Sequence, residues 1–201
     1  GSSIATGSFR SAPAADANSV KFLAYGDTRT NAASHALVAS AVNSTYAADP
    51  AYQTLLLHSG DWNNSDDETN WTNEYFNRSY SSLLQMQSSL PIMGCLGNHE
   101  LSGSGVSVFD KYWPYTYAGS PGSHYFSFDY GPVHVSVVDQ ETAAYGAGSA
   151  QLAWLANDLA TSTKKWKVIV LHAPGWCAGG SHPNDATVQQ YIQPLCEQYG
   201  V

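Results

Sequence analysis

An apolar run that closes on Gly-Asp occurs twice in this chain, each time ahead of a stretch with helical spacing of apolar residues. Residues 20–27 (VKFLAYGD) precede the stretch 32–48, and residues 53–61 (QTLLLHSGD) precede an amphipathic stretch that reaches Leu90. Such runs, bounded by a glycine turn, are typical of buried strands, and recurrence near every third or fourth residue is typical of helices. The repeated strand-helix unit predicts an α/β fold.

The remaining segments extend this pattern. A third short strand is expected within 91–100, followed by a long surface loop over 101–122 that is rich in Gly, Ser, Pro and aromatic residues. Residues 124–140 alternate in polarity around Tyr-Gly-Pro, which predicts two antiparallel strands. We then expect, in order, a helix over 149–162, a buried strand over 165–174, a Gly-rich loop over 175–181 and a final helix over 184–199.

The charge of the chain limits what it can bind. Its 201 residues carry a formal charge of −8, and only 12% of them are charged. An acidic chain disfavours nucleic acid or an anionic membrane as a partner, so a phosphate ligand requires a local positive centre. No apolar run approaches the ~20 residues of a membrane span, and residues 1–19 lack the order of a signal peptide. Few lysines and many aromatic residues suggest an exported protein, either secreted or periplasmic.

Polar residues gather where four predicted strands end. They are Asp27, Asp61, the triplet Asn98, His99 and Glu100, and His172. Loops at the carboxyl ends of strands converge in open α/β sheets, so we expect these residues to share one site. Carboxylate, amide and imidazole ligands suit hard or borderline metals such as Mn, Fe or Zn. A bridging Asp61 would hold two such ions ~3.5–4 Å apart.

Each candidate also has a structural interpretation. Asp27 and Asp61 could serve as helix N-terminal carboxylates, and His172 as a hydrogen-bonded buried imidazole. We assign Glu100 to a supporting or helix-capping role, because a third carboxylate would neutralise too much of the positive charge of the centre. His182 follows a flexible loop that could overhang the site, so both a surface role and a substrate contact stay open.

The motifs GD (26–27), GD (60–61), GNHE (97–100) and VLHAP (170–174) resemble those of the calcineurin-like metallophosphoesterase superfamily, and the purple acid phosphatase branch in particular. The resemblance implies an α/β/β/α sandwich of two mixed sheets around two divalent or trivalent metal ions. It implies that Asp61 bridges the ions, with Asn98 and His172 on one ion and Asp27 on the other. His99 would contact the substrate phosphate.

This sequence departs from the family pattern at three places. The last family motif, Gly-His-x-His, is absent, so we expect the C-terminal strands to be missing here or supplied by a separate fragment. Asn64 stands where purple acid phosphatases have a tyrosine ligand. Arg29 stands where other branches have a histidine. Because arginine stays protonated, Arg29 cannot be a metal ligand and is instead expected to clamp a phosphate oxygen.

The last expectations concern the division of the chain into two segments and the state of its three cysteines. Residues 1–19 are expected to be a linker or the last strand of an upstream β-sandwich domain, which GSFRSAP (7–13) resembles, and 20–201 the catalytic domain. Among Cys95, Cys177 and Cys196, at most one disulfide can form. We favour Cys177 with Cys196 if one does, and three free thiols are the alternative.

The function expected from these residues is hydrolysis of a small phosphate ester, either a monoester or a diester. The resemblance implies a metallophosphoesterase in which a metal-bound hydroxide attacks phosphorus in line, with Asp61 and His99 as the catalytic side chains. The alternative is a non-catalytic relative with a degenerate metal site that binds carbohydrate or protein through exposed aromatic residues. No organic cofactor is expected.

Overall fold

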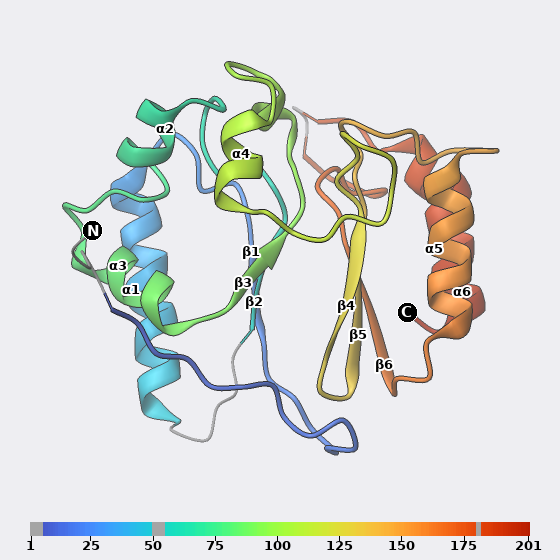
Figure 1. Cartoon of the computed structure of the whole chain (residues 1–201), viewed down its shortest axis with the longest axis horizontal. Helices are drawn as coiled ribbons and strands as arrows, with labels where there is room; N and C mark the ends of the chain where they lie inside the picture. The colour runs from blue at the N-terminus through green and yellow to red at the C-terminus, as the bar shows by residue number, and fades with distance from the viewer. Residues whose placement is uncertain (1–5, 50–54, 180–181) are drawn as a thin grey trace.

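The computed structural model describes residues 6–49, 55–179 and 182–201 and consists of two three-stranded sheets placed face to face between helices (Figure 1). Helices α1 and α3 cover the outer face of the first sheet, and α5 and α6 cover the outer face of the second (Figure 1). This α/β/β/α layering confirms the predicted fold class. One sheet is wholly parallel, whereas the other is mixed.

The first sheet contains β1 (Leu23–Tyr25), β2 (Leu56–His58) and β3 (Ile92–Gly94) in that order, all parallel. Register pairs Tyr25 with His58 and His58 with Gly94, so the three strands end side by side. Helix α1 (Ala32–Ala48) spans the predicted stretch, and the side chain of Asn31 caps its first turn by accepting from the backbone N–H of Ser34.

The amphipathic stretch predicted to run to Leu90 is broken in two. It forms α2 (Glu68–Asn73) and α3 (Ser81–Ser89). Between them the chain turns so that Tyr75 is fully buried, and the Gln87 side chain donates to the Tyr75 carbonyl oxygen. Burial of this ring therefore outweighs continuation of a single helix.

The long surface loop predicted over 101–122 is wrong in part, because it contains α4 (Ser107–Tyr112). The buried carboxylate of Asp66 accepts from the backbone N–H groups of Val108 and Phe109, which fixes the first turn of this helix. Aromatic residues of this region pack into the core beneath α4, where Phe109 is 1% exposed. A helix stabilised by a carboxylate 42 residues earlier in the chain leaves little local trace in the sequence.

The second sheet contains β4 (Phe126–Tyr130), β5 (Val133–Val137) and β6 (Trp166–Val170). Strands β4 and β5 are antiparallel, as the alternation around Tyr-Gly-Pro predicted, and Gly131 turns between them at φ 57°. Strand β6 runs parallel to β5 after the crossover helix α5 (Ala150–Thr161). The last helical segment is a π-helical turn, Val188–Ile192, that leads into α6 (Gln193–Tyr199).

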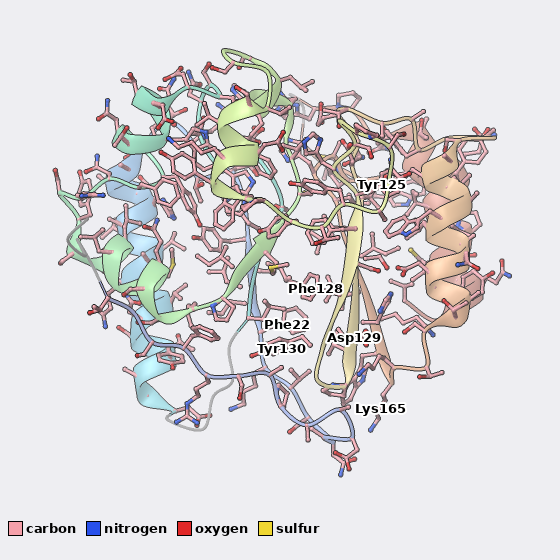
Figure 2. The ribbon with its side chains drawn as sticks, viewed as in Figure 1. Phe22, Tyr125, Phe128, Asp129, Tyr130 and Lys165 are labelled. Carbon is pink, nitrogen blue, oxygen red and sulfur yellow. The ribbon has the colours of Figure 1, made fainter. Side chains whose placement is uncertain are left out.

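The core between the sheets sets their relative position. Val135 and Val137 of β5 are fully buried and belong to one hydrophobic cluster with Leu57 of β2. Phe22, Phe128 and Tyr130 lie in the space between the two sheets in Figure 2. This packing holds the loops after β3 and β6 close together, as the contacts between Asn98 and His172 show.

The N-terminal segment and the cysteines each had two expected arrangements. Residues 6–19 form no helix or strand, and the backbone N–H of Ser8 donates to Ser88 O. GSFRSAP therefore forms no strand here, and an upstream domain stays a prediction. All three cysteines are free thiols, so the Cys177–Cys196 bridge does not form. Residues 1–5, 53–54 and 180–181 of the predicted segments lie outside the described residues.

None of the helices that the described residues form is long and apolar enough to cross a membrane.

Candidate metal centre

Both Gly-Asp turns place the aspartate itself in the left-handed backbone region, with φ 54° at Asp27 and φ 55° at Asp61. A non-glycine residue in this region costs of order 1–3 kcal/mol, and such strain concentrates at functional sites. The preceding glycines contribute differently. Gly60 is itself left-handed at φ 89°, whereas a Cβ on Gly26 would lie 2.1 Å from Ser59 Oγ. The backbone N–H of Asp27 donates to the Gly60 carbonyl oxygen, which ties the two turns together.

Asp61 lies at the centre of the site and is 2% exposed. Its Oδ1 accepts a hydrogen bond from the backbone N–H of His99 at 3.2 Å. Its Oδ2 accepts from Arg29 Nε at 2.9 Å. The Asp61 carboxylate is therefore held by one contact to the loop after β1, through Arg29, and by one contact to the loop after β3, through His99.

His172 brings a ring nitrogen from the second sheet to the same place. Its Nε2 lies 3.2 Å from Asn98 Oδ1 and 3.4 Å from Asp61 Oδ1. On the other side of the ring, Nδ1 lies 2.7 Å from the Ser59 carbonyl oxygen, which can only accept a hydrogen bond. Nδ1 therefore carries the proton, and in the neutral ring the Nε2 lone pair faces the two oxygens.

The residues present fit a metal ion at this point. Three lone pairs, from Asp61 Oδ1, Asn98 Oδ1 and His172 Nε2, converge without a hydrogen atom between them when the ring is neutral. A histidine ligand that donates its other N–H to a carbonyl is the usual arrangement at metal sites. The fit depends on the Asn98 amide, since in the described part of the chain no three His, Cys, Asp or Glu side chains form a metal-ligand group.

The position expected for a second ion, beside Asp27, is less well prepared. Asp27 is exposed and lines the same cavity as Asp61, Asn98 and His172. The oxygen of Asp61 that is not turned toward His172 is instead bonded to the guanidinium of Arg29. The structure therefore brings all four expected ligands to one cavity, and close contacts join three of them, Asp61, Asn98 and His172.

Glu100 supports the site from its buried side, as the sequence led us to expect. Its fully buried carboxylate accepts backbone N–H bonds from Gly97, Asp61 and Trp62 at 2.8, 3.1 and 2.9 Å. Burial raises the pKa of Glu100 to about 8, while the backbone N–H bonds act against this shift. Glu100 thus holds the turn that carries Asp61 against the turn that carries Asn98.

His99 lies beside the converging ligands rather than among them. Its Nδ1 lies 2.9 Å from the Asn64 carbonyl oxygen, so Nδ1 donates and Nε2 is the nitrogen left for other partners. Nε2 is 3.9 Å from Asp61 Oδ2. Asn64, which stands at the tyrosine position of the family, thus contributes its backbone oxygen to the orientation of His99.

The cavity over the site has a volume of about 440 Å³. His182 lines it, as the interpretation of an overhanging loop allowed, and is exposed. The sequence analysis did not single out four other polar residues of its wall: Glu141, Cys177, Asn184 and Asp185. Burial, followed by the charges of neighbouring carboxylates, raises the pKa of Glu141, although His172 opposes the shift.

Gln140 is a positioning residue that the sequence analysis also missed. Its Oε1 accepts from the backbone N–H groups of His172 and Ala173 at 2.8 and 2.7 Å, which fixes the loop after β6. A signal was present in the sequence, because Gln140 and Glu141 lie three and four residues after the end of the apolar strand β5 (Val133–Val137). The rule that led to the other site residues, polar groups at strand ends, applies to this strand as well.

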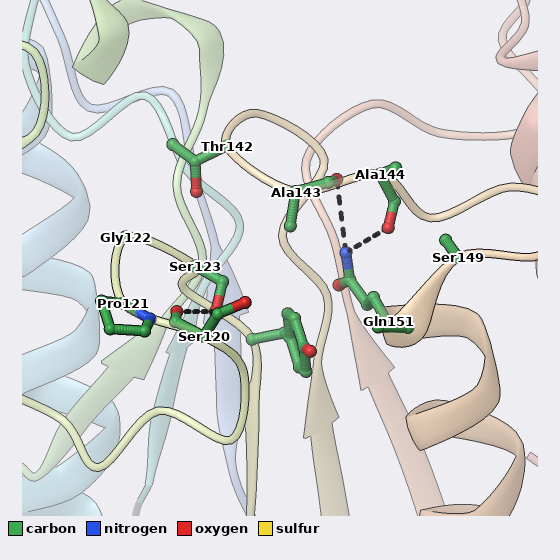
Figure 3. Close-up of a pocket in the computed structure, with 11 residues that line it drawn as sticks. Ser120, Pro121, Gly122, Ser123, Thr142, Ala143, Ala144, Ser149 and Gln151 are labelled. Carbon is green, nitrogen blue, oxygen red and sulfur yellow. Dashed lines mark hydrogen bonds between the residues drawn. The ribbon is translucent and has the colours of Figure 1, made fainter.

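A second hollow lies outside this site (Figure 3). It has a volume of about 290 Å³ and is lined by residues 120–123, Tyr125, 142–144 and 149–151. Gln151 Nε2 donates to the carbonyl oxygens of Ala143 and Ala144, so these polar groups are already paired (Figure 3). None of the predicted site residues lines this hollow, and it holds no side-chain charge.

Comparison with known proteins places the chain in a family. The sequence model of the calcineurin-like phosphoesterase family matches residues 20–201. The chain therefore belongs to this family of phosphoesterases, as its motifs indicated.

Purple acid phosphatases of Arabidopsis thaliana are similar over part of the chain. Probable purple acid phosphatase 20 is 31% identical over 111 residues, which are 50% of this chain and 26% of that protein. Purple acid phosphatase 15 is 28% identical over 125 residues, 57% of this chain and 23% of that protein. The chain thus spans about a quarter of the length of these relatives. Together with the family match, they confirm the predicted likeness to the purple acid phosphatase branch.

A solved structure confirms the fold. GAP50, described as the anchor in the inner membrane complex of Plasmodium, superposes with a TM-score of 0.62 over 90% of this chain and 63% of that chain. The sequence identity is 14%, so this likeness concerns the fold alone.

Proposed function

We propose that the chain forms the catalytic domain, residues 20–201, of a metal-dependent phosphoric ester hydrolase that acts on monoesters or diesters. The observation that carries this proposal is the convergence of Asp61, Asn98 and His172, from two different sheets, on one wall of a cavity. Membership of the calcineurin-like phosphoesterase family supports phosphoester hydrolysis as the class of reaction.

The donor set defines which ions would bind. Carboxylate, amide and imidazole donors suit Mn, Fe or Zn. Asp61, Asn98 and His172 would hold one ion, whereas a second ion beside Asp27 is what the resemblance alone implies. When bound, such ions supply Lewis acidity toward a phosphoryl oxygen and lower the pKa of a coordinated water.

His99 is the side chain that we propose as hydrogen-bond donor and acid. Because Nδ1 is held by the Asn64 carbonyl oxygen, a proton delivered by this ring leaves from Nε2. From Nε2 it can reach a phosphate oxygen or the departing alkoxide of a substrate placed beside Asp61. Acid assistance of this kind typically contributes 10²- to 10⁴-fold to the rate.

The surroundings of the site favour a small substrate. The cavity of about 440 Å³ is of the size that accepts a small ligand. We propose that Arg29 and His182 contact the phosphate ester, because a chain of net charge −8 attracts a phosphate only through local positive groups. Nucleic acid and membranes stay outside the expected partners, and secretion or a periplasmic location stays a prediction.

Replacing Asp61 by asparagine tests the function most simply. Asp129→Asn is a matched control, because it removes the same charge from the half-exposed Asp129, which lies at the turn end of β4 and outside the cavity wall. We expect Asp61→Asn to lose bound metal and turnover of chromogenic phosphate monoesters and diesters together, and Asp129→Asn to keep both. Full turnover in Asp61→Asn contradicts the assignment.

Replacing His99 by alanine separates chemistry from metal binding. The ring is not one of the three converging ligands, so we expect the metal content to stay at the wild-type value. The value of kcat should fall by roughly 10²-fold or more, the usual effect of losing a general acid. Loss of metal in His99→Ala would instead identify His99 as a ligand.

The alternative is a carbohydrate-binding relative that uses exposed aromatic residues. Trp62 and Trp71 are fully buried, whereas Trp176 is 69% exposed. Elemental analysis separates the two functions, since a non-catalytic relative is expected to hold no Mn, Fe or Zn after expression in metal-replete medium.

A further inference from the structure

Arg29 is attached to Asp61 at two points. The backbone N–H of Arg29 donates to the Asp61 carbonyl oxygen at 3.3 Å, and its side-chain Nε donates to Asp61 Oδ2 at 2.9 Å. The arginine side chain is 32% exposed, whereas the Asp61 side chain is 3% exposed. The guanidinium therefore covers the buried carboxylate and keeps one edge toward solvent.

The two oxygens of Asp61 thus have different partners. Oδ1 faces His172 Nε2 and lies in the group of converging lone pairs. Oδ2 is satisfied by a group that is always positively charged, because arginine does not deprotonate in proteins. A buried carboxylate needs such compensation, and here a side chain of the protein supplies it on one side only.

A second metal ion on the Oδ2 side would meet two obstacles. It would have to displace the guanidinium from Oδ2, and it would then lie next to a fixed positive charge. Arg29 also follows Asp27, the carboxylate expected to hold that ion, by only two residues in the chain. Neither obstacle exists on the Oδ1 side, where Oδ1 accepts from the backbone N–H of His99 and otherwise faces His172 and Asn98.

We propose that the guanidinium of Arg29 takes the place of the second cation, so that the centre binds one metal ion, at Asp61 Oδ1, Asn98 and His172. The Nη groups of Arg29 would then serve as a planar donor set for a tetrahedral oxyanion such as a phosphate monoester. Planar guanidinium donors match phosphate oxygens in a bidentate geometry. The oxyanion part of this proposal rests on the proposed function, whereas the metal count does not.

Metal titration of the wild-type protein and two variants tests the metal count. We expect wild-type protein to bind one equivalent of Mn²⁺ per chain in isothermal titration calorimetry, with elemental analysis giving the same number. Arg29→Gln should bind Mn²⁺ about tenfold more tightly, because a charge that competes for Asp61 is gone. Arg29→Lys keeps the charge and should stay within about threefold of the wild type. The tenfold change corresponds to 1.4 kcal/mol.

The sign of the Arg29→Gln effect distinguishes this role from a structural one. If Arg29 only held Asp61 in place, its loss would weaken Mn²⁺ binding, and that result overturns the proposal. Two equivalents of Mn²⁺ in the wild type overturn it as well. If Arg29→Gln fails to fold, as judged by circular dichroism, the wild-type stoichiometry and the Arg29→Lys affinity still decide the question.

Inorganic phosphate serves as the probe for the oxyanion part. In Mn²⁺-loaded protein, we expect the Kd for phosphate to rise at least tenfold in Arg29→Gln and to rise less in Arg29→Lys. An unchanged Kd in Arg29→Gln overturns this part. A wild-type protein that binds one Mn²⁺ and phosphate but hydrolyses no ester would contradict the proposed function and leave the inference on Arg29 standing.

Discussion

Asn98 Oδ1 and His172 Nε2 lie 3.2 Å apart, although 74 residues separate them in the chain. Asn98 follows β3 of the parallel sheet, and His172 follows β6 of the mixed sheet. Their contact is therefore produced by the packing of one sheet on the other. Any change that shifts the sheets by an ångström or two is expected to weaken the candidate metal centre without touching a ligand.

Gly97→Ala tests how closely the turns of the first sheet approach. A Cβ at this position would lie 2.3 Å from Asp61 Oδ1 and 2.4 Å from Asp61 N, so the carboxylate must move. We expect Mn²⁺ affinity to fall at least tenfold, measured by calorimetry. Gly146→Ala is the control, because the nearest atom to its Cβ lies at an ordinary 3.4 Å. Wild-type affinity in Gly97→Ala would contradict the described geometry.

Glu100 offers a test of stability rather than of metal binding. Glu100→Ala leaves the buried N–H groups of Gly97, Asp61 and Trp62 without acceptors. Because each unsatisfied donor costs about 1–3 kcal/mol, we expect the free energy of unfolding to drop by about 3 kcal/mol or more. Glu100→Gln keeps one acceptor oxygen, so its free energy of unfolding, measured by urea denaturation, should lie between those of the wild type and Glu100→Ala. A loss below about 1 kcal/mol in Glu100→Ala would show that these N–H groups find other partners.

His134 predicts a pH dependence of stability far from the candidate centre. Its two ring nitrogens each lie 2.9 Å from a carboxylate, Asp129 Oδ1 and Asp158 Oδ2, and carboxylates accept at both contacts. The hydrogen bond to Asp158 raises the pKa of His134, and the bond to Asp129 adds to this rise. Burial of the ring acts against it. Because the pKa of His134 is higher in the folded than in the unfolded protein, protonation of this ring stabilises the fold. The stabilisation is complete below the pKa of the unfolded state, about 6.5, and is lost as pH rises through the pKa of the folded state.

Urea denaturation from about pH 5.5 to about pH 9 measures this effect. We expect the wild type to lose about 1 kcal/mol of stability over this range, the size of an ion pair that is partly open to solvent. His134→Gln should lack this part of the decline, whereas the exposed His182→Gln should keep it. A decline of equal size in His134→Gln would assign the pH dependence to other groups.

The sequence predicted the elements whose signal is local. The stretch 32–48 matches α1 because its apolar residues lie within the segment and the capping Asn31 directly precedes it. The hairpin around Gly131 follows from a turn signal that is likewise local. Helix α4 was missed because the side chain that starts it, Asp66, lies in a distant loop. Tyr75 divides the predicted amphipathic stretch through burial, which spacing alone does not reveal.

The same distinction holds for the candidate site. The strand-end rule placed Asp27, Asp61, Asn98 and His172 around one cavity, because parallel strands end at a common edge. It did not predict that Arg29 would occupy Asp61 Oδ2, since an ion pair between two turns depends on side-chain reach across the sheet. The rule was not applied to the end of β5, where it would also have indicated Gln140, whose side chain fixes the loop after β6.

An anomalous-scattering map of wild-type crystals soaked in Mn²⁺ measures the convergence most directly. The account predicts one peak at about 2.0–2.3 Å from Asp61 Oδ1, Asn98 Oδ1 and His172 Nε2, the range of metal bonds to oxygen and nitrogen. The guanidinium of Arg29 should still contact Asp61 Oδ2 in the same map. A peak that none of these three atoms coordinates, or no peak at saturating Mn²⁺, would contradict the account.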